Sequence, residues 1–231
     1  MNVWQRISKI YSDPKATFSS FERSITLKDV TVPILILLVV SFGAQLLVGP
    51  IAINEQISRI EQRQDIPPEQ KEAILDRMDS IIGNSVSVKG FLLTTVTTLL
   101  GFVLLAGVVL FFGSFILAGE ATFQQALAVV VFVGMIGVLE WAVKIPLILQ
   151  SGTIQVETGM ALFLPVSLDG SLLYRFFHRL DFFAMWKIAL IAMGTATVFR
   201  TTEKSARLAY YSAWAVLMFL LAWLFDGRMM A

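Results

Sequence analysis

The sequence predicts an all-α membrane protein, a polytopic bundle of about five transmembrane helices with amphipathic helices at the membrane interface. Composition is the first observation, because 56% of the 231 residues are hydrophobic, only 15% are charged, and the mean hydropathy is +0.74. Soluble domains carry about 25% charged residues, and so few charges could not cover this much apolar surface in water. The second observation is that the apolar runs are continuous and do not alternate with polar residues. This pattern favours transmembrane helices over membrane strands.

Five apolar runs predict the spans. A transmembrane helix needs roughly 20 predominantly apolar residues; the second run is the longest of the five, and no run is shorter than the fourth. Glycine and alanine recur in the second, third and fourth runs, which suits close helix packing in a membrane. The spans are predicted at about 32–53, 88–118, 126–149, 183–199 and 209–225, within a transmembrane domain of residues 31–231.

Residues 1–30 form an amphipathic segment before the first span. Arg6 lies off the apolar face of its first helix, and Asp13 followed by Pro14 predicts the N-cap and first residue of a second helix. Phe18 would anchor that second helix. A basic helix with aromatic residues lies naturally in the membrane interface, so we expect peripheral anchoring, with a protein-docking surface as the alternative. The apolar face consists of Trp4, Ile7, Ile10 and Tyr11.

Two loops carry further amphipathic patterns. Residues 54–87 predict a helical extramembrane loop, which is too small to enclose an active site with its own core. The loop after the third span ends in Ser171–Leu180, whose apolar residues recur at helical spacing. That pattern predicts an interfacial helix leading into the fourth span. Its polar face carries Arg175, His178 and Arg179.

Glu140 and Lys144 form a candidate polar pair inside the third predicted span. Ionisable residues within a span are costly and are functional candidates by default. Their spacing of four residues places both charged groups on one helical face, where they neutralise each other. One interpretation is a relay for protons or solutes. The other is an internal ion pair near the helix end, with Lys144 extending toward the interface.

No catalytic, metal or cofactor site is predicted. His178 is the only histidine, and three carboxylates near it in sequence are irregularly spaced, which is a weak metal signal; we expect an interfacial, hydrogen-bonded histidine instead. Cysteine is absent, and the sequence holds no zinc-protease, phosphate-loop or nucleophile-elbow motif. The net charge of +1 gives no electrostatic reason to expect nucleic acid as a partner. We therefore expect a protein that is not an enzyme.

The distribution of basic residues predicts a cytoplasmic N-terminus. An odd number of spans places the two termini on opposite sides of the membrane, and basic residues in short flanks favour the cytoplasmic side. The acidic loop 54–87 lies on the opposite side in this arrangement. The flank before the first span and the link after the fourth carry Arg6, Lys9, Lys15, Arg23, Lys28, Arg200, Lys204 and Arg207.

Three stretches, taken in this order, resemble the bacterial branch of the Yip (Ypt-interacting protein) domain family. They are Ser12–Phe18, Ala118–Leu127 and Leu180–Ala206. The resemblance implies five membrane helices with the N-terminus in the cytoplasm. Eukaryotic relatives are implicated in binding small GTPases and carry an Asp-Leu-Tyr-Gly-Pro motif before the first span. This chain has Leu-Lys-Asp-Val at 27–30 instead, so GTPase binding is not carried over.

The family resemblance also marks individual positions for which a local physical reason exists. Asp181 can cap the fourth helix, and Trp186 fits the aromatic belt of a membrane interface. Glu120 precedes the third span, where a carboxylate favours a helix N-terminus. The positions that match the family pattern are Pro14, Phe18, Glu120, Asp181, Trp186 and Gly194.

The sequence therefore favours a non-enzymatic, multi-pass protein of the Yip-domain type in the cell (cytoplasmic or inner) membrane. It would organise protein partners or lipids through its N-terminal helix and its bundle, and a homo-oligomer is another expected form. The alternative is a small transporter or lipid-handling protein with a polar path at Glu140 and Lys144. An intramembrane enzyme ranks third.

Overall fold

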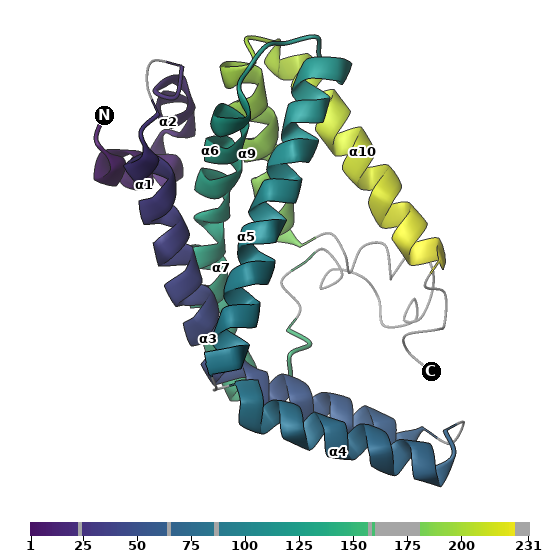
Figure 1. Cartoon of the computed structure of the whole chain (residues 1–231). Coiled ribbons are helices and arrows are strands. Elements are labelled where there is room, and N and C mark those ends of the chain that lie inside the picture. Colours follow the sequence, from purple (N-terminus) through teal and green to yellow (C-terminus); the bar gives the residue numbers. More distant parts are fainter. Residues whose placement is uncertain (23–24, 64–65, 86–87, 157–158, 160–180, 225–231) are drawn as a thin grey trace. The chain divides into compact units, whose positions relative to one another are not determined.

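The computed structural model describes residues 1–22, 25–63, 66–85, 88–156, 159 and 181–224 (Figure 1). Every regular element in those residues is a helix, so the all-α prediction is confirmed. The helices are α1 (Val3–Ser12), α2 (Pro14–Ser19), α3 (Leu27–Gln62), α4 (Pro68–Ser85), α5 (Val88–Phe111), the π-helical turn η1 (Phe112–Ile116), α6 (Phe123–Gly134), α7 (Ile136–Ser151), α9 (Phe182–Val198) and α10 (Glu203–Leu224).

The described residues contain three helices that are long and apolar enough to cross a membrane. They are Leu27–Gln62, Gly90–Ile116 and Phe123–Ser151, and Phe182–Val198 is a shorter apolar helix. A multi-pass membrane protein is therefore supported, whereas crossings by α9 and α10 stay predictions. α3 extends beyond both ends of the predicted first span, and its last turns carry polar residues of the predicted extramembrane loop.

The segment predicted as the third span consists of two helices, because the hydrogen-bond ladder breaks at Met135. Met135 closes α6, and its carbonyl accepts a short-range bond from the backbone N–H of Val138 at 3.1 Å. The same carbonyl accepts a hydrogen bond from the Tyr11 hydroxyl at 2.8 Å. Glycines at 134 and 137 flank the break and lower the helix propensity there. A side chain inserted into the ladder is a recognised cause of such breaks.

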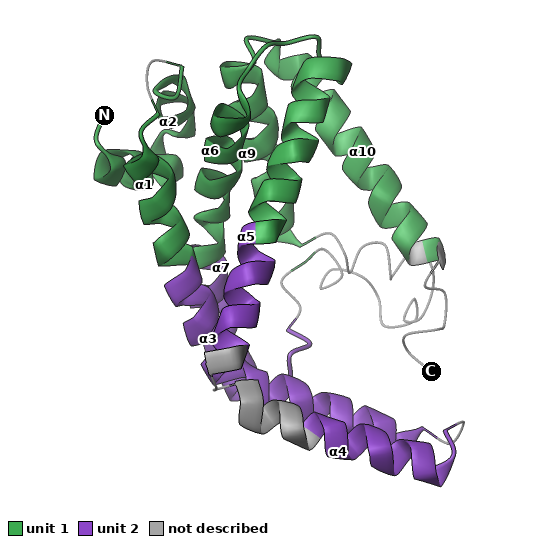
Figure 2. Cartoon of the chain, in the orientation of Figure 1, with its two compact units in different colours: residues 1–37, 100–138, 157–230 green, residues 38–99, 139–156, 231 purple. Residues whose placement is uncertain are grey.

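The chain divides into two compact units (Figure 2). Unit 1 comprises Met1–Leu37, Leu100–Val138 and Glu157–Met230, and unit 2 comprises Leu38–Leu99, Leu139–Val156 and Ala231. In unit 2, Glu55 holds the segment after α7, because its carboxylate accepts hydrogen bonds from the Thr153 hydroxyl at 2.9 Å and the Ile154 N–H at 3.0 Å.

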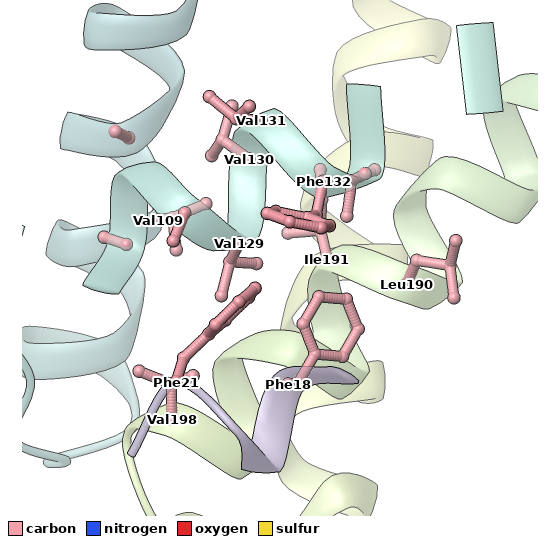
Figure 3. Close-up of a cluster of buried hydrophobic side chains, with 14 of the residues drawn as sticks. Phe18, Phe21, Val109, Val129, Val130, Val131, Phe132, Leu190, Ile191 and Val198 are labelled. Carbon is pink, nitrogen blue, oxygen red and sulfur yellow. The ribbon is translucent and has the colours of Figure 1, made fainter. Parts of the chain in front are cut away.

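The core of unit 1 lies where α2, α6 and α9 meet. α9 packs against both α2 and α6, and α1 packs against α2 and α6. Figure 3 shows the Phe18 and Phe21 rings pointing into a cluster that contains Val129 and Ile191. Phe18 is fully buried, and Phe21 is 1% exposed. The N-terminal helices thus contribute core side chains instead of lying only along a surface.

One phenylalanine and two glycines fix the ends of η1 and α9 in unit 1. The Phe199 ring is buried against Gly113, and a Cβ built on Gly113 would overlap three atoms of that ring. Gly119 lies against the Phe199 backbone in the same way. Only glycine leaves room for these approaches.

We predict that Gly113→Ala destabilises the protein by about 1–3 kcal/mol, the usual effect of overpacking a closed core. The matched control is Gly107→Ala six residues earlier, where a Cβ would meet nothing within 4 Å. That control should be neutral or up to about 1 kcal/mol stabilising, since alanine is the better helix former. Thermal unfolding of the two variants in the same detergent checks the prediction, and equal Tm values for both would contradict it.

Candidate functional site

A cavity of about 880 Å³ opens in unit 1 between the link from η1 to α6 and the link from α9 to α10. Its lining includes two acidic side chains, Glu22 and Glu120, and one basic side chain, Arg200. The hydroxyl groups around it come from Thr122, Thr201, Thr202 and Ser205. Segments about 80 residues apart in sequence thus build one polar cavity.

The second residue of each link lies in the left-handed backbone region. Ala118 has φ 52° and Arg200 has φ 56°, a conformation that costs a residue other than glycine roughly 1–2 kcal/mol. Each one closes a helix end: the Gly119 N–H donates to the Gly113 carbonyl at 2.8 Å, and the Thr201 N–H donates to the Ala196 carbonyl at 2.9 Å. These bonds set the geometry of the cavity walls.

Two helices begin at the cavity with threonine caps. Thr122 and Gln125 form a capping box at the start of α6, and the Thr202 hydroxyl accepts from the Ser205 N–H at 3.3 Å at the start of α10. The Gln125 amide also donates to the Phe21 carbonyl at 3.4 Å. The N-terminal segment is thereby attached to the cavity wall.

Three residues singled out in the sequence lie on α2 and α9, two helices that pack together. Pro14 occupies the first position of α2 after the Asp13 N-cap, as predicted. Phe18 on that helix packs against Gly194, because a Cβ on Gly194 would lie 3.1 Å from the Phe18 ring and 2.6 Å from a Val129 methyl group. The glycine at 194 is thus required by the close approach of α2 and α6 to α9.

The other singled-out residues lie elsewhere. Asp181 caps α9, as predicted: its carboxylate accepts from the Phe183 N–H at 2.7 Å and the Ala184 N–H at 3.1 Å. Trp186 is half-buried, with its ring 5.9 Å from that of Phe182. Arg175, His178 and Arg179 fall outside the described residues, as does the interfacial helix predicted for them.

A comparison with family models decides the relationship of the chain. The Yip1 domain model matches residues 8–224, which is nearly the whole chain. The chain belongs to the Yip1 domain family. A search of curated proteins and a search of solved structures each found no match. The family recognised from three short stretches is therefore confirmed, and the Yip1 region includes α2, the cavity and α9.

A buried ion pair joins the N-terminal helix of this Yip1 protein to its first span, and sequence reasoning missed it. Arg6 Nη1 lies 2.6 Å from Asp29 Oδ2, with side chains only 3% and 7% exposed. The guanidinium also lies 5.4 Å from the centre of the Phe21 ring. Asp29 Oδ2 accepts two more bonds from Thr26, at 2.8 Å from N and 2.7 Å from Oγ1.

The pair corrects the predicted position of Arg6 on α1. Arg6 was expected off the apolar face and is buried, whereas Trp4 is 63% exposed and its interfacial position stays a prediction. A guanidinium is buried without a large free-energy cost only when it is paired with an opposite charge. Asp29 supplies that counter-charge inside unit 1. Trp4 remains a candidate for contact with lipid or a partner.

Glu140 and Lys144 are paired on α7 in unit 2. Lys144 Nζ lies 2.6 Å from Glu140 Oε1, and the side chains are 22% and 19% exposed. The cavity described above lies in unit 1, and neither residue lines it. This geometry fits the internal ion pair; a transport role stays a prediction.

Glu140→Gln tests the transport alternative. We expect the same proton flux for the wild type and the variant, because a neutralised i,i+4 pair needs no proton exchange to be stable. The measurement is quenching of a pH-sensitive dye in proteoliposomes under an imposed gradient. A flux in the wild type that the variant loses would support transport and reject the structural interpretation.

Lys15 links α2 to the start of α10. Its ammonium lies 3.0 Å from Glu203 Oε1, and the Arg207 guanidinium lies 2.7 Å from Oε2. The hydrogen bond and positive charge of Lys15 lower the pKa of Glu203 below its ordinary value. A lowered pKa in the folded state means that the ionised form is stabilised by folding.

The predicted pH dependence follows in sign from that lowered pKa. The ion pair of Glu203 contributes fully to the free energy of unfolding above the ordinary pKa of glutamate, about 4.3. That contribution is lost as pH falls through the lower pKa of Glu203 in the folded state. Lys15 is largely exposed, so we expect only about 0.2–1 kcal/mol, screened by salt. Melting curves between about pH 7 and about pH 3 should show the wild type losing its advantage over Glu203→Gln, and an advantage unchanged by acid would contradict this.

Proposed function

We propose that this Yip1-family protein is not an enzyme and that it organises protein partners or lipids in the cell (cytoplasmic or inner) membrane. The observation that carries the proposal is the end of unit 1 where Glu22, just after α2, and two links line a polar cavity. The residues there are fixed by core packing and caps, so the surface is preorganised for binding. Family membership and three apolar spanning helices support a membrane setting.

The proposed orientation places this end in the cytoplasm. Basic residues of the N-terminal flank and of the link after α9 belong to the same end of unit 1, since Lys15 pairs with Glu203 at the start of α10. Short basic segments favour the cytoplasmic side of a bilayer. The absence of a recognisable catalytic motif in the sequence supports a binding role over an enzymatic one.

Affinity purification in mild detergent, with identification of bound proteins and lipids, tests the proposal. Removing the N-terminal helices would also remove Phe18 and Phe21 from the core, so a point variant on an exposed residue is the sharper tool. Trp4→Ala removes an aromatic side chain that is 63% exposed on α1. Exposed aromatic residues are frequent anchors of protein interfaces.

The expected result is that Trp4→Ala loses members of the co-purifying set while it stays inserted and keeps its Tm. The matched control is Trp223→Ala on α10, where the side chain is 59% exposed. That variant should retain the set. Identical sets of proteins and lipids for the wild type and Trp4→Ala would count against organisation through the N-terminal helix.

A further inference from the structure

The cavity carries charges of both signs that the protein itself leaves unmatched. Glu22, Glu120 and Arg200 line it, and all three are exposed. Within the described residues, the structure pairs none of these three side chains with another group. Near the cavity, by contrast, Lys15 pairs with Glu203 at 3.0 Å. The cavity therefore offers both a cationic and an anionic contact to a ligand.

An apolar rim adjoins the polar lining. Ile116 lines the cavity and is the last residue of the second candidate span. It is 55% exposed, and the neighbouring Phe115 is 78% exposed. A membrane protein presents such side chains to lipid tails. A ligand with a zwitterionic head and an acyl tail would match both surfaces at once.

We propose that this cavity binds the headgroup of a zwitterionic aminophospholipid, with its phosphate at Arg200 and its primary ammonium at Glu22 and Glu120. The inference rests on the proposed function and names its lipid class. The volume of about 880 Å³ falls within the usual range of small-ligand sites. The quaternary ammonium of phosphatidylcholine has no N–H to donate to the carboxylates, and the headgroup of phosphatidylglycerol has no cation. Both lipids should therefore bind more weakly than phosphatidylethanolamine.

The test is native mass spectrometry of the full chain released from bilayer discs that contain equal amounts of phosphatidylethanolamine, phosphatidylcholine and phosphatidylglycerol. The variants are Arg200→Asn, in which asparagine tolerates the left-handed backbone, and Glu120→Gln. The matched controls are Lys204→Asn and Glu72→Gln, which neutralise exposed residues outside the cavity lining. Tm values of all variants check that folding is retained, and each cavity variant tests the proposal independently.

The expected result is preferential retention of phosphatidylethanolamine by the wild type and both controls. Loss of one charge-assisted contact should lower that retention by about tenfold or more. Soluble glycerophosphoethanolamine forms a second arm: displacement of the lipid at millimolar concentration would support the headgroup chemistry and assign a soluble source. Failure to displace, with the lipid retained, would support the membrane lipid. Equal retention of all three lipids, or unchanged retention in both cavity variants, would overturn the proposal.

The two proposals fail in different measurements. If phosphatidylethanolamine shows no preference but Trp4→Ala still loses co-purifying proteins, the lipid site is wrong and the organising role stands. If the co-purifying proteins and lipids are identical for Trp4→Ala and the wild type, the organising role through α1 is wrong, whatever the cavity retains.

Discussion

Arg6→Met should destabilise the protein by about 3–5 kcal/mol, because it leaves the Asp29 carboxylate buried without its counter-charge. Both side chains are less than a tenth exposed, and the two groups are 2.6 Å apart. Methionine fills a similar volume, so the loss comes from the unpaired charge and not from a cavity. Thermal or denaturant unfolding in detergent or in bilayer discs measures the effect. The N-terminal helix should also become more accessible to proteolysis.

Two further variants separate charge from packing. Lys9→Met makes the same chemical change at an exposed position of α1 and should shift stability by no more than about 0.5 kcal/mol. Asp29→Asn added to Arg6→Met removes the stranded charge and keeps an oxygen that Thr26 can donate to. The double variant should recover most of the loss. Equal stability of Arg6→Met and Lys9→Met would refute the role assigned to the pair.

Local sequence rules predicted the features that depend on neighbours along the chain. Asp13 before Pro14 predicted the start of α2, and Asp181 was recognised as the cap of α9. The i,i+4 spacing of Glu140 and Lys144 predicted a shared face, and the two groups are 2.6 Å apart. Caps and i,i+4 pairs need only helix geometry, so a sequence contains all that is required to find them.

Features built from distant segments could not be predicted in this way. Thr26 followed by Asp29 is a capping pattern before an apolar run, which could have located the start of α3. Nothing local indicates that Arg6, 23 residues earlier, reaches the same carboxylate. The break between α6 and α7 at Met135 is also only partly local. Glycines at 134 and 137 indicate a weak point in the helix, but the Tyr11 hydroxyl that bonds the Met135 carbonyl comes from another helix.

The cavity shows why family positions were easier to recognise than to explain. Glu120 stood out as part of a stretch, yet its neighbours in space include Glu22 and Arg200, which lie on other segments. Gly194 stood out as a small residue in a membrane helix, where simple packing was the expected reason. The structure gives that packing a specific partner, the Phe18 ring on α2.

Phe18→Ala should therefore cost about 3–5 kcal/mol, the usual effect of emptying a fully buried phenylalanine site. The ring is fully buried and lies 6.1 Å from the Phe21 ring, centre to centre. Because α2 packs directly on α9, its loosening should also weaken the cavity wall to which Glu22 belongs.

Phe115→Ala is the matched control, since the side chain is 78% exposed in the same unit. An apolar side chain that faces lipid gains little from the protein, so this variant should keep its Tm within a few degrees, corresponding to about 0.5 kcal/mol. Hydrogen exchange should rise in α2 and at the start of α10 for Phe18→Ala and not for Phe115→Ala. Similar Tm values for the two variants would mean that α2 is a surface anchor, as the amphipathic pattern alone suggested, and not part of the core.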